Sequence, residues 1–227
     1  AARWGDKIKP GRVVTDFVST TDFGPTFLEA AGLKIPDDMT GRSLMTLFES
    51  DKSGRVQENW DSILVGKERH VPSQEAPDMG GYPSRGLRTD DYFLIVNFKP
   101  QRWPNGTPHY EQAALPGTWF GDTDNGPTKT YIIENKDKDS AHRQAYELCF
   151  GKRPEVELYD LSRDPQQVEN VAQHPDYKDI RQKLIADLMT RLKATGDPRV
   201  TDSKIDFDSY PYLGGGPKHP NAGKKKK

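Results

Sequence analysis

The sequence predicts an α+β fold in which a small antiparallel sheet packs against one long helix. Residues 85–98 form two short apolar runs around Thr89-Asp90-Asp91, a pattern typical of a hairpin. Residues 176–195 carry apolar side chains at intervals of three and four, which is typical of a helix with one buried face. The chain of 227 residues is long enough to bury such a core, and its 10% aromatic content argues against disorder.

The N-terminal part is expected to contain one strand and two short helices. Residues 13–18 are mostly β-branched or aromatic, which favours a strand. The next helix begins near Pro25, because proline suits a first helical turn, and Gly32 suits the position just after a helix. Ser43 can then cap a short helix over residues 44–48.

The remaining elements are short until the long helix is reached. A buried strand is expected at residues 62–65, ahead of the hairpin. Residues 99–127 are rich in Pro, Gly, Trp and Asn and predict an irregular excursion, a type of segment that often carries function. A helix over residues 140–150 and a short strand over residues 157–160 follow.

Composition argues against several classes of protein. With 33 Lys and Arg against 34 Asp and Glu, the net charge is −1, which lacks the basic footprint of a nucleic-acid-binding domain. No apolar stretch approaches the roughly 20 residues that span a bilayer. The single cysteine, Cys149, has no partner for an intrachain disulfide. We therefore expect no nucleic-acid partner, no membrane span and no disulfide scaffold.

Charged side chains follow the predicted strand at residues 62–65. Glu68, Arg69 and His70 come directly after it and should emerge at its end, and Arg85 begins the next strand pair. Arginine can hold a carboxylate or sulfate by two parallel hydrogen bonds, and histidine can donate to an oxyanion or a hydroxyl. These four residues are our candidates for substrate binding. The alternative is a surface ion pair between Glu68 and Arg69 and a hairpin salt bridge at Arg85.

Aromatic residues suggest a function of another class. Trp103, Tyr110 and Trp119 could form a flat platform on which a sugar ring stacks, as in a stand-alone carbohydrate-binding module. More often such rings fasten an irregular loop to the core. A purely structural module without catalysis is the third alternative.

Several short motifs occur in order along the chain. They are Trp4-Gly-Asp-Lys-Ile-Lys-Pro-Gly11, Asp16-Phe-Val-Ser-Thr-Thr-Asp22, Gly41-Arg-Ser-Leu44, Gly81-Tyr-Pro-Ser-Arg85, Arg88-Thr-Asp-Asp-Tyr-Phe93, Glu157-Leu-Tyr-Asp160 and Thr195-Gly-Asp-Pro198. Together they resemble the C-terminal portion of a sulfatase of the alkaline-phosphatase-like superfamily. The resemblance is strongest to the N-sulfoglucosamine sulfohydrolase and bacterial carbohydrate sulfatase branch, and it covers about residues 4–199.

This resemblance implies a domain division and a location. Residues 1–48 would be the last strand and helix of an α/β main domain, and residues 49–199 the C-terminal sulfatase subdomain. Residues 200–227 are rich in Gly, Pro and Lys, which predicts a flexible tail. The chain would pack against an N-terminal sulfatase domain in an enzyme that acts on sulfate esters or sulfamates of carbohydrates. A periplasmic or secreted location follows from the same resemblance.

The resemblance also implies a formylglycine nucleophile and a calcium ion for the full-length enzyme. Sulfatases carry both in segments that precede the matched region. Residues 81–85 reproduce the Pro-Ser-Arg end of the formylglycine motif, but Gly81 stands where Cys or Ser is oxidised, and glycine has no side chain to oxidise. We therefore expect no catalytic residue and no metal ligand in this chain, and no activity from the chain alone.

Overall fold

The computed structural model describes residues 1–223. It divides into two compact units. Unit 1 comprises residues 1–64 and 87–91, and unit 2 comprises residues 65–86 and the chain from Tyr92 onward. The domain boundaries implied by the resemblance, after residues 48 and 199, stay predictions.

Unit 1 carries the two short helices expected from the sequence. After a 3-10 turn at Thr20–Asp22, α1 spans Phe23–Ala30, and α2 spans Met45–Glu49. Gly32 follows α1 with a φ of +71°, a left-handed conformation that glycine adopts without steric cost. A small core of Leu44, Leu47 and Trp60 lies beneath these helices.

The strand expected at residues 13–18 is reduced to a single bridge between Val14 and Gly54. Thr15 N–H donates to Gly54 O at 3.0 Å, and Phe17 N–H donates to Trp60 O at 3.0 Å. The backbone of this segment therefore meets a loop and not a neighbouring strand. A run of β-branched and aromatic residues forms a regular strand only where another strand lies beside it, and unit 1 provides none here.

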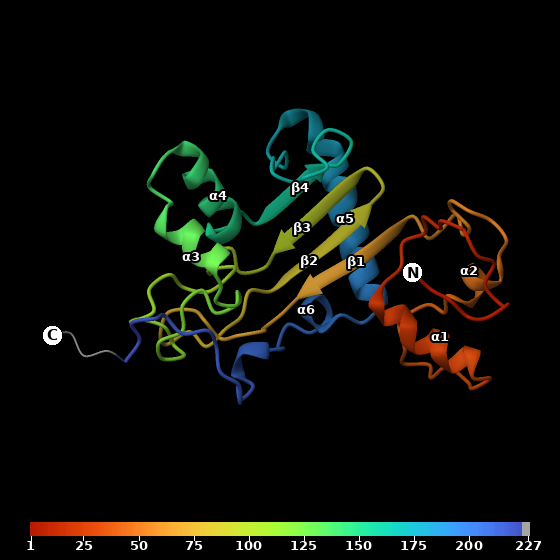
Figure 1. Ribbon diagram of the computed structural model, residues 1–227, viewed down its shortest axis with the longest axis horizontal. Helices are drawn as coiled ribbons and strands as arrows, with labels where there is room; N and C mark the ends of the chain where they lie inside the picture. The colour runs from red at the N-terminus through yellow and green to blue at the C-terminus, as the bar shows by residue number, and fades with distance from the viewer. Residues whose placement is uncertain (224–227) are drawn as a thin grey trace. The chain divides into compact units, whose positions relative to one another are not determined.

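The predicted antiparallel sheet is present. It has four strands in the order β1-β2-β3-β4, and neighbouring arrows in Figure 1 point in opposite directions. The strands are β1 (Ser62–Lys67), β2 (Ser84–Thr89), β3 (Tyr92–Asn97) and β4 (Val156–Asp160). In the register of β3 and β4, Leu94 lies opposite Leu158, and both side chains are fully buried.

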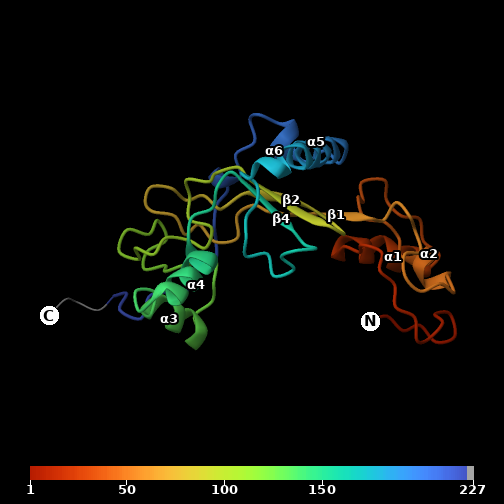
Figure 2. The same ribbon diagram turned by 90° about the horizontal axis from the view of Figure 1, so that it is seen from above.

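The long helix α5 spans Lys178–Ala194 and covers one face of this sheet. A 3-10 turn at Pro175–Tyr177 leads into it. Figure 2 shows α5 on one side of the strands, where it packs against β3. Leu184, Leu188 and Leu192 form its buried stripe, as the spacing of apolar residues predicts.

A helical hairpin stands beside the irregular excursion. Helix α4 (Ser140–Phe150) was expected, whereas α3 (Pro127–Glu134) was not. Trp119 and Phe120 from the excursion pack with Tyr146 and Phe150 from α4 in one aromatic cluster. The irregular segment of residues 99–127 therefore packs on a separate aromatic core that it shares with α4.

The segment after α5 contains α6 (Pro198–Thr201) and a 3-10 turn at Phe207–Ser209. Flexibility is predicted for residues 200–227, yet the described part makes defined contacts with the excursion. Thr118 bridges Lys218, and Trp119 N–H donates to Pro217 O at 2.9 Å. Residues 224–227 of the predicted tail lie outside the described residues. None of the helices within residues 1–223 is long and apolar enough to cross a bilayer.

Candidate functional site

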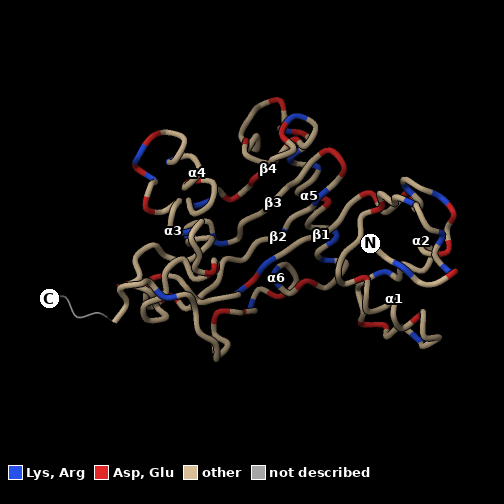
Figure 3. Tube along the Cα trace, in the orientation of Figure 1, with Lys and Arg blue, Asp and Glu red and all other residues tan. Residues whose placement is uncertain are grey.

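The end of β1 carries the predicted binding residues. Its apolar run passes through Gly66, where an added Cβ would lie 2.8 Å from Arg85 Cδ. Glycine is therefore required for the Arg85 side chain to cross the strand. Figure 3 shows basic and acidic residues close together near the end of β1 and α6.

Arg85 and Glu68 belong to one network of ion pairs. Arg85 Nε donates to Asp197 Oδ2 at 2.6 Å, and Arg85 Nη2 donates to Glu68 Oε1 at 2.7 Å and to Asp197 Oδ1 at 3.1 Å. Arg85 Nη1 donates to the carbonyl oxygens of Lys67 and Ser84. Glu68 also binds the guanidinium of Arg199.

These contacts occupy all five N–H donors of Arg85, whose side chain is only 10% exposed. Burial alone would lower the pKa of Arg85, but the carboxylates of Asp197 and Glu68 raise it above its ordinary value. Burial would likewise raise the pKa of Asp197, and Arg85 holds it below the ordinary value. Arg85 therefore forms salt bridges, with Glu68 and Asp197, which lie outside the hairpin, and Glu68 pairs with Arg85 and Arg199 and not with Arg69.

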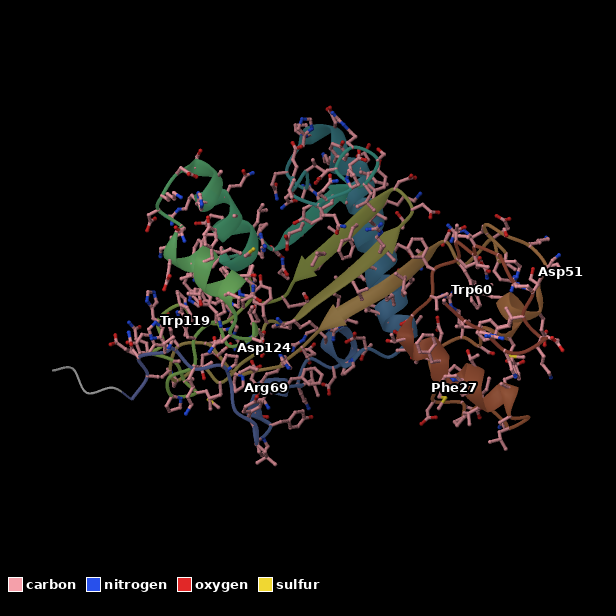
Figure 4. All side chains as sticks on the ribbon, viewed as in Figure 1. Phe27, Asp51, Trp60, Arg69, Trp119 and Asp124 are labelled. Atoms are coloured by element: carbon pink, nitrogen blue, oxygen red, sulfur yellow. The ribbon has the colours of Figure 1, made fainter. Side chains whose placement is uncertain are left out.

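Arg69 is held by the C-terminal segment (Figure 4). Its Nη1 donates to Asp208 O at 2.9 Å and its Nη2 donates to Tyr210 O at 2.6 Å. The backbone of Gly81 passes so close that an added Cβ would lie 2.4 Å from Arg69 Cα. Gly81 therefore serves close packing at this point.

A second arginine fastens the same C-terminal segment. Arg102 is buried and pairs with Asp208 at 2.8 Å and with Asp78 at 2.8 Å. Burial would raise the pKa of Asp208, but Arg102 holds it below its ordinary value. The sequence offered no signal for this cluster, because its members are separated by 24 and 106 residues.

His70 is the most exposed of the four candidates, with 76% of its side chain accessible. Its Nδ1 lies 3.2 Å from Oδ1 of Asp122, a carboxylate that is only 4% exposed. The other oxygen of Asp122 pairs with Lys67 Nζ at 2.6 Å. The exposed ring of His70 is thus held by the buried carboxylate of Asp122. The sequence did not indicate that Asp122 lies near His70.

A buried lysine holds the loop that carries Asp122. Lys129 Nζ donates to four oxygens of residues 119–125: Trp119 O at 2.8 Å, Phe120 O at 3.2 Å, Thr123 O at 2.7 Å and Asn125 Oδ1 at 3.0 Å. Burial lowers the pKa of Lys129 to about 8, against an opposing effect of Asp124. Its ammonium group links the loop in the way a small bound cation would.

The aromatic residues of the carbohydrate-platform alternative pack against the protein. Trp119 is buried, with Lys129 Nζ 4.9 Å from its ring centre. Tyr110 stacks on His219 at 3.9 Å with an interplanar angle of 2°, and Lys152 Nζ lies 4.6 Å from the centre of Trp103. These rings fasten loops, as the structural interpretation expects.

The positions of the acidic and histidine side chains decide whether they could bind a metal ion together. Within residues 1–223, no group of three or more His, Cys, Asp or Glu side chains is placed to hold a metal ion. The carboxylates near β1 are instead paired with arginine or lysine. These paired carboxylates therefore do not fit a calcium site.

The sequence of this chain is similar to one protein family and to several known proteins. Residues 1–104 match the family described as N-sulphoglucosamine sulphohydrolase, C-terminal. An ulvan-active sulfatase of Formosa agariphila is 35% identical over 196 residues, which are 86% of this chain and 33% of that protein. The N-sulphoglucosamine sulphohydrolase of Homo sapiens is 25% identical over 84% of this chain and 35% of its own length.

A solved structure shares the fold. It is a protein in complex with its substrate D-glucosamine-2-N,6-O-disulfate, with a TM-score of 0.54 at 20% identity, covering 89% of this chain and 29% of that one. The chain thus spans about a third of the length of the proteins it matches.

Proposed function

We propose, from the premise that this chain is a C-terminal portion of a sulfatase, that it forms the substrate-facing rim of an enzyme that hydrolyses sulfate esters or sulfamates of carbohydrates. Support for the substrate class comes from the relatives, whose names refer to ulvan and to N-sulphoglucosamine. Support for a partial role comes from coverage, since the chain spans only about a third of each relative.

In this proposal the recognition residues are Arg69 and His70, and Glu68 and Arg85 support the end of β1 that carries them. The observation that carries the proposal is the placement of His70, whose ring is exposed but held by a contact with a buried carboxylate. An exposed polar side chain that is held in one orientation loses little conformational entropy on binding, which suits recognition. Glu68 and Arg85 act indirectly, because their charges are already paired with Arg199 and Asp197.

Calcium and formylglycine belong to the rest of the enzyme in this proposal. The resemblance to sulfatases implies both groups, whereas the paired carboxylates near β1 do not fit a calcium ion and Gly81 does not fit the nucleophile. In this proposal the rest of the enzyme carries out the attack on sulfur, and this chain contributes contacts to the sugar. We further propose a periplasmic or secreted location, where sulfated polysaccharides are encountered.

The partner of unit 1 is the remainder of the sulfatase. Val13, Val18, Phe23 and Phe27 are exposed apolar side chains of this unit. Two of them, Val18 and Phe23, line a cavity of about 1090 Å³ whose other lining residues, including Val14, Leu44 and Phe48, also come from the first 51 positions. Exposed apolar surface of this kind is typical of an interface. In this proposal it is covered by the part of the sulfatase that corresponds to the two thirds of the relative outside the matched region.

The test is the variant His70→Ala in the complete enzyme, assayed on a sulfated disaccharide and on 4-nitrophenyl sulfate. A group that touches the remote part of a substrate contributes binding energy that a small substrate never uses. Losing one such hydrogen bond should cost about 2 kcal/mol, or about thirtyfold in kcat/KM, on the disaccharide only.

His174→Ala is the matched control, because it removes another exposed histidine of unit 2. Its kcat/KM should equal that of the wild type on both substrates. The melting temperature of His70→Ala should also stay unchanged, since the ring packs little. Equal losses on both substrates, or a lowered melting temperature, would assign His70 to the fold and reject the proposal.

A further inference from the structure

The contact between His70 and Asp122 has a chemical consequence for the exposed ring. Asp122 Oδ1 lies 3.2 Å from His70 Nδ1 and accepts the Val71 N–H at 3.1 Å. An ionised carboxylate can only accept hydrogen bonds, so the proton in this contact must reside on Nδ1. Nε2 of a neutral ring is then an acceptor.

Asp122 is well suited to stay an acceptor. Lys67 Nζ lies 2.6 Å from Oδ2 and donates also to Pro104 O at 3.0 Å, so a positive charge is fixed beside the carboxylate. The Asp122 side chain is 4% exposed, which limits competition from water. Its backbone N–H donates to Asn105 O at 3.1 Å, and Lys129 ties together the surrounding loop.

We infer that Asp122 is the positioning residue of the site: it holds His70 in the Nδ1–H form and presents Nε2 as an acceptor for a donor group of the substrate, such as a sugar hydroxyl. The hydrogen bond on one ring nitrogen decides which form the other presents. A sulfate oxygen has no proton to give and does not fit a neutral ring in this form. The inference rests on the proposed function for the identity of the ligand, but not for the state of the ring.

A purely structural role for Asp122 would be to join Lys67 and Val71 to the loop. Such a role leaves the proton of His70 unspecified, because a free imidazole ring can carry it on either nitrogen. The form of the ring therefore separates positioning from simple cross-linking.

The experiment is long-range 1H–15N correlation of the histidine rings in the 227-residue chain, with His70 identified by its loss in His70→Ala. At a pH where the ring is neutral, the wild type should show a pyrrole-type Nδ1 and a pyridine-type Nε2. In Asp122→Ala no carboxylate faces Nδ1, so the Nε2–H form of the ring should appear beside the Nδ1–H form.

Asp124→Ala is the matched control, because it makes the same change at an exposed position of the same loop. Its His70 signals should equal those of the wild type. A wild-type ring in the Nε2–H form, or a ring that stays wholly in the Nδ1–H form in Asp122→Ala, would overturn the inference. If Asp122→Ala does not fold, the spectrum of the wild type alone still tests the inference.

The complete enzyme supplies a second readout on a sulfated disaccharide. Asp122→Ala should lower kcat/KM by no more than the thirtyfold of His70→Ala, and the double variant should be no worse than His70→Ala alone. Additive losses would contradict positioning through His70. A correct ring form combined with normal activity of His70→Ala would instead reject the proposed function and leave the positioning intact.

Discussion

Replacement of Lys129 by methionine should destabilise unit 2 by about 3 kcal/mol at neutral pH. The change removes an ammonium group whose three N–H donors are shared among four oxygens. At about 2 kcal/mol for each charged donor, the loss is about 6 kcal/mol. It also removes the cost of burying the charge. A pKa lowered from 10.5 to about 8 corresponds to about 3 kcal/mol of that cost, which offsets half of the loss.

The difference between the two proteins should depend on pH with a definite sign. Because the pKa of Lys129 is lower in the folded state, the unfolded chain binds more protons between pH 8 and 10.5. The free energy of unfolding of the wild type should therefore rise relative to Lys129→Met as pH increases through this window. Burial raises the pKa of Tyr82 and Tyr159 well above the usual range, but both tyrosines are present in both proteins and cancel.

Urea unfolding followed by circular dichroism at pH 7 and at pH 9.5 measures both effects. Lys138→Met is the control, since Lys138 is exposed on the loop that precedes α4 and should change the unfolding free energy by less than about 0.5 kcal/mol. A loss below about 1 kcal/mol for Lys129→Met, or a difference that shrinks as pH rises, would refute the account of Lys129 as the cation that holds residues 119–125.

Three further predictions concern the ion pairs, the activity and the local stability. Arg85→Gln removes the arginine that pairs with the largely buried Asp197, while Glu68 keeps its ion pair with Arg199, and it should lower the free energy of unfolding by about 3 kcal/mol. Because the pKa of Asp197 is lowered in the folded state, this difference should fade as pH falls below about 4, and a difference constant down to pH 2 would contradict it. The 227-residue chain alone should not hydrolyse 4-nitrophenyl sulfate with or without calcium, and calcium-dependent turnover by the pure chain would refute this expectation. Amide exchange should be slow in α5 and fast in residues 13–18, which have a single bridge to residue 54, whereas equal protection of both would show that unit 1 is stable without a partner.

The sequence predicted those parts of the fold that depend on local pattern. The hairpin of β2 and β3, helix α4 and helix α5 each have a period or a turn that is visible in a single segment. The prediction of a strand at residues 13–18 was wrong, because a strand forms only where another strand can pair with it. The composition of a segment carries no information about which segment lies beside it.

The sequence offered candidate binding residues only beside β1. Arg69 and His70 were chosen because they follow a strand, and their role stays a prediction. Their contacts were not predicted, because Asp122 lies 52 residues away from His70 and Asp208 lies 139 residues away from Arg69. Contacts between distant loops leave no periodic signal. Lys129 was missed together with α3, although Gly126-Pro127 is a recognisable helix start that could have indicated that helix.

In our proposal the end of β1 faces the sugar of the substrate in the complete enzyme. The decisive measurement is a crystal structure of that enzyme, inactivated at its nucleophile and bound to a sulfated disaccharide. We expect His70 Nε2 within about 3.2 Å of a sugar hydroxyl oxygen, with Asp122 still bound to Nδ1. A disaccharide that contacts no residue between Lys67 and His70 would contradict the claim.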